Sequence, residues 1–421
     1  MKRSWIAGLL TLALALGIAV SSAQAAVTIQ FTFWGSADYQ AAMNTLIAQF
    51  EKENPGINVE PIVIPSKYYD KLMTMIAGGT APDVAMLAFD RVPEYVDAGA
   101  IQPIDPFVQA SGYPIKDLFP VVVRAFTRGG KLYGLPRSFS PFVLFYNSDL
   151  AAARGVVPSD NWKWGDLLAA AKKLTPRPGF APWGFAANFE ADGTLYPEWF
   201  FPWIWQNQGE VVDVANRRSA LLSQPTREAM DFYIGMIQDS KVAPNSVQAQ
   251  TYGGSDSLFL SRNGAMIVEA YNMALSARTQ ENFRFDVARL PYQKERATVA
   301  FPIGYVMPAQ AKHPNEAFKL MQFLGGPQAQ KIVPQLGLGM PGLRSIAESD
   351  LFLQPGKMPA HSRVFLQDAE IAQPLPSDLP KFQEWYKAWT QEMAGALAGT
   401  ESLEKALARA DAAINRILST K

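Results

Sequence analysis

Cysteine is absent from the chain, which excludes disulfide bonds, thiolate zinc sites, iron–sulfur clusters and a cysteine nucleophile. Histidine is nearly absent, with only His313 and His361, so a histidine-rich metal site is excluded too. Neither sign of charge is in excess, because 38 Lys and Arg residues balance 38 Asp and Glu residues. Such a chain lacks the electrostatic footprint of a general nucleic-acid-binding protein. We therefore expect no metal, no cofactor and no nucleic-acid partner.

Apolar and aromatic residues, in contrast, are plentiful. The 421 residues are 48% hydrophobic and 18% charged, which suits a large buried core in two or three domains. Aromatic residues make up 12% of the chain and include ten Trp, a high share that calls for an explanation.

The first 25 residues have the three parts of a secretory signal. Lys2 and Arg3 precede an uncharged run over residues 5–20, and Ala23-Gln24-Ala25 supplies the small residues of a cleavage site. The alternative is a membrane anchor, although the apolar run is short. A lipid anchor is excluded, because its attachment needs a cysteine. We expect cleavage after Ala25 and an exported, soluble, periplasmic or extracellular protein.

The N-terminal part of the exported chain alternates between strand and helix patterns. Residues 27–33 alternate apolar and polar side chains, and residues 43–50 carry apolar side chains at helical spacing. The same succession follows at 57–64 and 69–76, and a short apolar run at 84–87 reads as a third strand. This order is typical of a parallel α/β sheet.

The middle of the chain is rich in tryptophan. Six tryptophans lie between residues 158 and 209, namely Trp162, Trp164, Trp183, Trp199, Trp203 and Trp205. Helical stripes follow at 230–237, 317–324 and 403–418, without a short repeat or a low-complexity linker. Two α/β lobes between which the chain crosses fit this pattern better than a string of separate domains.

Five segments, in order, resemble motifs of the extracellular solute-binding proteins of ABC importers, in the sugar-binding family that includes maltose-binding protein. They are GTAPDV at 79–84, GKLYGLP at 130–136 followed by LFYN at 144–147, FLSRNGAMI at 259–267, PNEAFKLMQFLGGPQAQ at 314–330, and GMPGLRS at 339–345. Each motif alone is weak, but five in the family's order behind an export signal are specific.

The resemblance implies a type II periplasmic-binding-protein fold, with two doubly wound α/β lobes around a ligand cleft. We place the first lobe at 27–137 plus 291–335 and the second lobe at 138–290 plus 336–421. It also implies a monomer that binds a mono- or oligosaccharide between the lobes and delivers it to the transmembrane subunits of an ABC permease. In open α/β sheets, ligands bind beyond the carboxyl ends of strands, which agrees with such a cleft.

A sugar needs aromatic rings for its C–H faces and carboxylates, amides or Arg for its hydroxyls. Trp34 and Ser36 directly follow the first expected strand, where a ligand would lie. Asp90 and Arg91 follow the third strand and resemble an Asp-Arg pair that holds sugar hydroxyls in the maltose protein. The alternatives are a core position for Trp34 and a surface ion pair for Asp90 and Arg91.

The resemblance adds further candidates for ligand contact. Phe139 and Ser140 fall in the first crossover, where Ser140 replaces a carboxylate of the maltose protein. Trp199 and Trp203 fall in a segment that resembles the aromatic floor of the second lobe, although tryptophans at this spacing cannot all face one way. The remaining candidates are Tyr271 and Asn272 after an apolar run, Gly304 and Tyr305 near the hinge, and Arg344 in the 340–345 turn.

Two rival functions remain open. A secreted carbohydrate-active enzyme would need two carboxyl groups that flank a glycosidic bond, and no pair stands out among the 38 acidic residues. The chain has no G-x-S-x-G elbow, Walker loop or dinucleotide fingerprint. Within the same family, a glycerol-phosphate-type ligand would require Arg137, Arg344 or a helix N-terminus to meet a phosphate. We expect a binding protein without catalytic residues.

Overall fold

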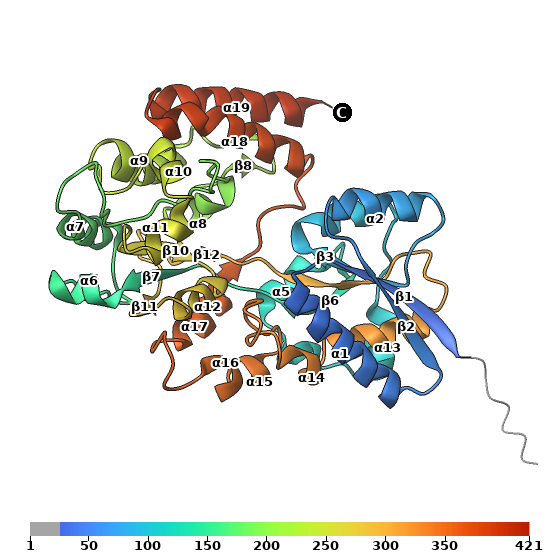
Figure 1. The fold of residues 1–421 in the computed structure, drawn as a ribbon. Helices are drawn as coiled ribbons and strands as arrows, with labels where there is room; N and C mark the ends of the chain where they lie inside the picture. The colour runs from blue at the N-terminus through green and yellow to red at the C-terminus, as the bar shows by residue number, and fades with distance from the viewer. Residues whose placement is uncertain (1–25, 421) are drawn as a thin grey trace, which may run out of the picture.

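In the computed structural model, which describes residues 26–420, two α/β lobes lie side by side (Figure 1). The first lobe contains a five-stranded sheet in the order β2-β1-β3-β13-β6. Its strands are β1 (Val27–Phe33), β2 (Ile57–Val63), β3 (Val84–Ala88), β6 (Gly134–Ser138) and β13 (Ile303–Val306). β1 pairs in parallel with β2 and β3, as the alternation predicted, and β13 is antiparallel to β3 and β6.

The helices of the first lobe come from two distant stretches of chain. In Figure 1, α13 and α14 from the later stretch are orange and lie among the blue and cyan elements of the earlier one. They are α1 (Ala37–Glu53), α2 (Tyr68–Ala77), α3 (Val92–Asp97), α4 (Asp105–Ser111), α5 (Pro120–Ala125), α13 (Pro314–Leu324) and α14 (Pro327–Gln330). Apolar side chains of α1 and β1 are buried together, as with Phe31 and Phe50. Successive side chains of β1 point to opposite faces of the sheet, and its apolar side chains enter this core. The carboxyl end of β1 lies at the edge of the sheet that faces the second lobe (Figure 1).

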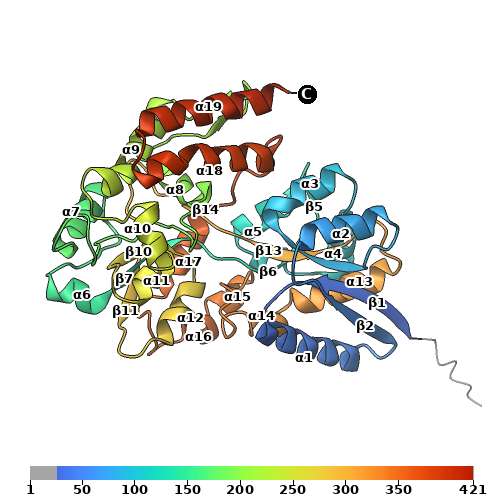
Figure 2. The same ribbon diagram turned by 45° about the horizontal axis from the view of Figure 1, so that its top comes forward.

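The second lobe is built on a three-stranded sheet in the order β10-β7-β11. The strands are β7 (Val143–Asn147), β10 (Met266–Glu269) and β11 (Phe285–Ala288). The helices are α6 (Ser148–Ala153), α7 (Trp164–Leu174), α8 (Phe201–Gln206), α9 (Gln224–Gln238), α10 (Ser246–Thr251), α11 (Ser255–Leu260), α12 (Asn272–Arg278), α15 (Arg344–Ala347), α16 (Asp350–Leu353), α17 (Arg363–Ile371), α18 (Phe382–Ala398) and α19 (Leu403–Ser419). Figure 2 shows α18 and α19 lying antiparallel across the top of this lobe.

Short strand pairs and three connecting segments complete the molecule. The pairs are β4 (Thr127–Arg128) with β5 (Lys131–Leu132), β8 (Val212–Asp213) with β9 (Arg218–Ser219), and β12 (Thr298–Val299) with β14 (Ala372–Gln373). The chain passes between the lobes at 139–142, 300–302 and 331–343. These connections pair with one another, through the bridges of Phe139 with Met340 and of Pro141 with Ala300. The predicted two-lobed fold is therefore confirmed.

One expected lobe boundary needs correction. Residues 291–299 were expected in the first lobe, yet Tyr292 bridges to Lys163 and the Lys294 amide donates to the Gln206 carbonyl at 2.9 Å. Both partners belong to the second lobe, so the chain crosses back at 300–302. The local sequence pattern could not reveal this, because residues 292–295 are held by backbone hydrogen bonds to Trp162 and Gln206, which lie far away along the chain.

No helix within residues 26–420 combines the length and the apolar character needed to cross a membrane. The expected signal peptide, residues 1–25, lies outside the described residues.

Candidate functional site

A cavity of about 340 Å³ opens where the two lobes and their connections meet. The first lobe contributes Asp90 and Arg91, from the short helical turn η1 (Phe89–Arg91) that follows β3. The second lobe contributes Glu198, from the turn η3 (Pro197–Trp199), and Gln383 near the start of α18. The remaining lining residues are Ala88, Phe89, Tyr196, Phe301, Pro302, Ile303, Leu375, Phe382 and Tyr386. A ligand here would touch both lobes.

A row of aromatic rings connects the lobes beneath this cavity. Phe89 lies 5.8 Å from Phe301, which lies 5.2 Å from Phe142. Phe142 in turn stacks on Trp199, with centroids 4.1 Å apart and planes at 10°. Trp199 is only partly buried and packs against the core. Phe89 and Phe142 are only 3% and 2% exposed, so of this row the partly buried Phe301 and Trp199 are the rings that could meet the C–H face of a sugar.

Asp90 links the first lobe to α18. Its Oδ2 accepts a hydrogen bond from Gln383 Nε2 at 3.2 Å and lies 3.4 Å from Arg91 Nε. Burial raises the pKa of the Asp90 carboxyl, and the Arg91 charge opposes that rise. The Arg91 guanidinium also lies 4.9 Å from the ring centre of Tyr69. Its position is therefore fixed by a carboxylate and an aromatic ring together.

Trp34 stands beside this pair. Its half-buried ring lies 4.7 Å from that of Tyr68 and 5.6 Å from that of Tyr69. It shares Tyr69 with Arg91, so it belongs to the same wall of the first lobe. Ser36, two residues on, is exposed and caps α1 by accepting a hydrogen bond from the Tyr39 amide at 3.3 Å.

A smaller cavity of about 150 Å³ lies in the second lobe and shares Trp199 with the aromatic row. Its acidic lining residues are Glu190, Asp256 and Glu269. Among the described residues that line it there is no Lys, Arg or His. We call it the acidic pocket. Glu269 ends β10, is only 7% exposed, and accepts a hydrogen bond from the Ala270 amide at 2.7 Å.

Glu198 lines the interlobe cavity and directly precedes Trp199, which lines the acidic pocket. Burial raises its pKa to about 8, and the charges of Glu190 and Asp90 add to that rise. Its Oε2 atom is buried and has no hydrogen-bond partner among the described residues. Burial, together with Asp256 and the other nearby carboxylates, also raises the pKa of Glu269. Burial and like charge thus both favour the protonated forms of Glu198 and Glu269.

The structure brings some predicted residues to the cavities and places others in the core. Asp90, Arg91 and Trp199 line the cavities. Trp203 is 1% exposed, because it lies on the buried face of α8 among Trp164 and other aromatic rings, so its expected ligand contact is corrected to a core role. The spacing alone could not tell which tryptophan belongs to the helix and which to the turn before it.

The crossover candidates are also structural. Phe139 is 1% exposed and bridges to Met340, which fixes two connections side by side. The Ser140 hydroxyl accepts a hydrogen bond from the Tyr271 amide at 2.8 Å, so it is occupied within the protein. The ring of Tyr271 is fully buried, at 4.8 Å from that of Phe352.

The last four predicted positions lie away from both cavities. Asn272 is exposed at the first position of α12. Tyr305 is 1% exposed, and a Cβ at Gly304 would lie 2.5 Å from the Leu135 carbonyl oxygen, so this glycine serves the close approach of β13 to β6. Arg344 forms an ion pair with Glu370. These four residues line neither cavity.

The sequence reasoning missed several lining residues. Glu198 and Tyr196 flank Pro197 just before the tryptophan-rich helix. No motif marks them, because a single acidic residue and a single tyrosine beside a proline are common in loops. Gln383 and Tyr386 lie three positions apart at the start of α18, on one face of that helix. Their helical spacing can be recognised in the sequence, but their proximity to Asp90 arises only from tertiary folding.

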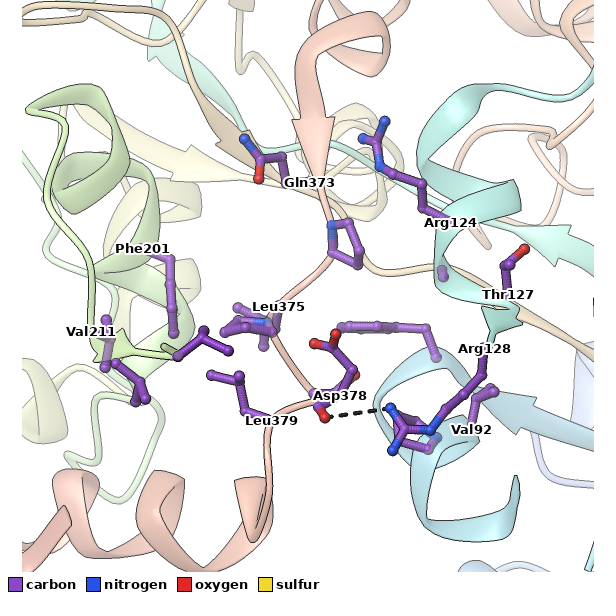
Figure 3. Close-up of a pocket in the computed structure, with 18 of the residues that line it drawn as sticks. Val92, Arg124, Thr127, Arg128, Phe201, Val211, Gln373, Leu375, Asp378 and Leu379 are labelled. Atoms are coloured by element: carbon purple, nitrogen blue, oxygen red, sulfur yellow. Dashed lines mark hydrogen bonds between the residues drawn. The ribbon is translucent and has the colours of Figure 1, made fainter. Parts of the chain in front are cut away.

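A further cavity of about 400 Å³ lies along the segment 373–379, as Figure 3 shows. It shares Phe89 and Leu375 with the interlobe cavity. Its two arginines are already engaged. Arg124 donates to the Ala372 carbonyl at 2.6 Å, and Arg128 binds Asp97 at 2.8 Å and reaches the Asp378 carbonyl at 3.4 Å. Arg128 is thus neutralised by a carboxylate, whereas Arg124 bonds to a neutral carbonyl and keeps its positive charge at this cavity.

Comparisons with known proteins agree with the fold. The family described as "Bacterial extracellular solute-binding protein" matches residues 34–331, and the chain belongs to that family. It is similar to an ABC substrate-binding protein from Listeria monocytogenes, solved in complex with cycloalternan, with a TM-score of 0.80 and 25% identity over 94% of this chain and 100% of that one.

Two curated relatives have named ligands. An arabinooligosaccharide-binding protein of Bacillus subtilis is 24% identical over 344 residues, which cover 76% of this chain and 74% of that protein. An sn-glycerol-3-phosphate-binding periplasmic protein of Shigella dysenteriae is 25% identical over 292 residues, which cover 67% and 65%. The expected family and fold are thus confirmed, and the relatives differ in ligand.

Proposed function

We propose that this solute-binding protein binds a carbohydrate in the interlobe cavity and delivers it to an ABC permease. The observation that carries the proposal is the lining of the interlobe cavity, where the aromatic side chains Tyr196, Phe301 and Tyr386 lie together with the carboxyl groups of Asp90 and Glu198. Rings supply apolar contact with a sugar face, and carboxylates accept hydrogen bonds from its hydroxyls. The named sugars of the Listeria and Bacillus relatives support the same ligand class.

Ligand binding would favour closure of the lobes. Asp90 of the first lobe and Glu198 of the second face one cavity, so a sugar that contacts both stabilises the state in which they are near each other. The Asp90–Gln383 hydrogen bond already joins the two sides. A closed, loaded protein then presents a surface that differs from the empty one, which is how a permease distinguishes them.

A glycerol-phosphate ligand fits the charges less well. Arg91 is the only basic side chain among the described lining residues of the two cavities, and it is already beside Asp90. Arg137 is 7% exposed and its Nε donates to Ser138 Oγ at 3.1 Å, while Arg344 is paired with Glu370. A phosphate in these two cavities would therefore find no arginine that is free of a partner to hold it.

The test is a melting-temperature and tryptophan-fluorescence titration of residues 26–421 with mono- and disaccharides and glycerol-3-phosphate. We expect a sugar to raise the melting temperature with its concentration. The sugar is recovered intact by chromatography if the protein only binds, whereas its cleavage would show a carbohydrate-active enzyme. A response to glycerol-3-phosphate alone would overturn the carbohydrate proposal.

A further inference from the structure

The residues that line the interlobe cavity include two with a buried polar atom that has no hydrogen bond within residues 26–420, one from each lobe. We propose that one of them, on the Glu198 carboxyl, meets the ligand as a neutral hydrogen-bond donor to an uncharged sugar oxygen, so that the protein holds its sugar at acidic and neutral pH and loses affinity at alkaline pH. This inference rests on the proposed carbohydrate function and adds the role of one residue and a regulation by pH.

The two atoms are Glu198 Oε2 and Arg91 Nε. Glu198 reaches the cavity from the turn η3 of the second lobe, and Arg91 reaches it from η1 of the first. Each atom is shielded from water and has no hydrogen-bond partner in the described part of the chain, although Arg91 Nε lies at an ion-pair distance of 3.4 Å from Asp90 Oδ2. Buried polar atoms are otherwise almost always paired in proteins. Two unpaired ones at one cavity therefore indicate where polar atoms of a ligand belong.

The surroundings of Glu198 favour its neutral form. No donor of the described chain is bonded to Oε2, and Arg91, the one basic side chain among the described lining residues, already lies beside Asp90. A buried carboxylate without a cation or a donor is costly, so a carboxyl group in this position keeps its proton instead. The charges of Glu190 and Asp90 act in the same direction, and the pKa of Glu198 is raised to about 8.

Other titratable groups lie around Glu198. Those beside it or across the cavity are Glu190, Glu269, Asp90, Arg91, Tyr196 and Tyr386. The helix α8, which follows η3 directly, carries none. Because the Arg91 charge favours the ionised form of Asp90, the two carboxyl groups at the cavity differ in role. Asp90 accepts hydrogen bonds from sugar hydroxyls, whereas Glu198 donates one.

The donor role makes binding depend on pH. A neutral carboxyl has one O–H donor, whereas an ionised carboxyl only accepts. The ring and glycosidic oxygens of a sugar have lone pairs and no hydrogen, so they pair with the neutral form and are repelled by the ionised one. Sugar binding therefore raises the pKa of Glu198 further, and at a pH where part of the free protein has lost this proton the complex takes one up from the buffer. The affinity falls as pH rises through the pKa of the free protein.

Calorimetry across pH tests the proposal. The probes are cycloalternan, arabinotriose, arabinose, glucose, galactose and maltose, each titrated at half-unit steps from pH 6 to 9.5. For a sugar that binds, we expect the Kd to stay nearly level up to about pH 7.5 and to rise about 10-fold by pH 9.5. Titrations at pH 8.5 in two buffers of different ionisation enthalpy should show the uptake of about 0.5–0.7 proton per sugar. A Kd that stays level or falls with rising pH, or a release of protons, overturns the proposal.

Three variants test whether the pH dependence belongs to this residue. Glu198→Gln retains an N–H donor and cannot ionise, so the rise of the Kd with pH and the proton uptake should both disappear. Glu198→Met removes the donor at similar length and should bind about 3- to 10-fold more weakly at pH 7. Glu404→Gln, at an exposed position of α19, is the matched control and should keep the pH profile of the wild type. A profile that persists in Glu198→Gln places the proton on another group, such as Glu269, and refutes the assignment.

The outcomes separate this inference from the proposed function. A sugar that binds with the same affinity at every pH keeps the carbohydrate function and rejects the donor role of Glu198. Absence of binding by every probe over the whole pH range rejects the carbohydrate function, and the donor role with it. The proton uptake of the wild type needs no variant, so it decides the proposal even if a Glu198 variant fails to fold.

Discussion

The orphaned carboxyl of Glu198 should make the protein less stable as pH rises. Burial raises the pKa of this group from 4.5 to about 8, so folding favours its protonated form. Its contribution is most favourable below pH 4.5 and is lost between pH 4.5 and 8, as the unfolded chain ionises and the folded one does not. At about 1.4 kcal/mol per pKa unit, the full loss is roughly 5 kcal/mol, and water in the cleft lowers it to about 2–5 kcal/mol.

The Glu198→Gln variant isolates this effect. An amide cannot ionise, so the variant should gain about 2–5 kcal/mol relative to the wild type between pH 4.5 and 8 and no more above pH 8. The assay is the melting temperature of both proteins at half-unit pH steps without ligand, with Glu404→Gln as the control for a lost surface charge. A difference between wild type and Glu198→Gln that stays constant with pH would refute the reasoning, because it would show that folding does not raise the pKa of this carboxyl.

Three further substitutions test the site and its support. Asp90→Ala should abolish sugar binding in calorimetry without lowering the melting temperature much, since this carboxylate faces the cavity, and retained affinity would remove Asp90 from the site. Trp199→Ala should weaken binding about 3- to 10-fold through lost ring stacking and reduce the ligand-induced fluorescence change; an unaltered dissociation constant would contradict the aromatic floor. Gly304→Ala should destabilise the protein by about 1–3 kcal/mol in thermal melts, because the new methyl group would meet the Leu135 carbonyl oxygen, and an unchanged melting temperature would show that β13 can shift.

Local patterns accounted for the first lobe well. The alternation in β1 and the helical stripe in α1 depend on neighbours within a few residues, so they can be recognised in a sequence. The choice of Asp90 and Arg91 rested instead on the resemblance to an Asp-Arg pair of the maltose protein, and the structure places both residues directly after β3 at the interlobe cavity. The segment that contains β12 was expected in the first lobe but lies in the second. Its partner strand, β14, is more than 70 residues further along the chain, so no local pattern shows the pairing.

The candidate site could be predicted only in part, and the reason lies in how it is built. Gln383 meets Asp90 across 293 residues of sequence, and no local pattern encodes such a contact. Trp199 and Trp203 have the same side chain and lie four residues apart. Trp199 ends the turn η3 beside a cavity, whereas Trp203 lies on α8 and is buried in the core. Burial, and with it the pKa of Glu198, is a property of the packed chain. Glu198 illustrates the limit, because its raised pKa and its Oε2 atom without a hydrogen-bond partner among the described residues both follow from tertiary packing and not from its neighbours in the sequence.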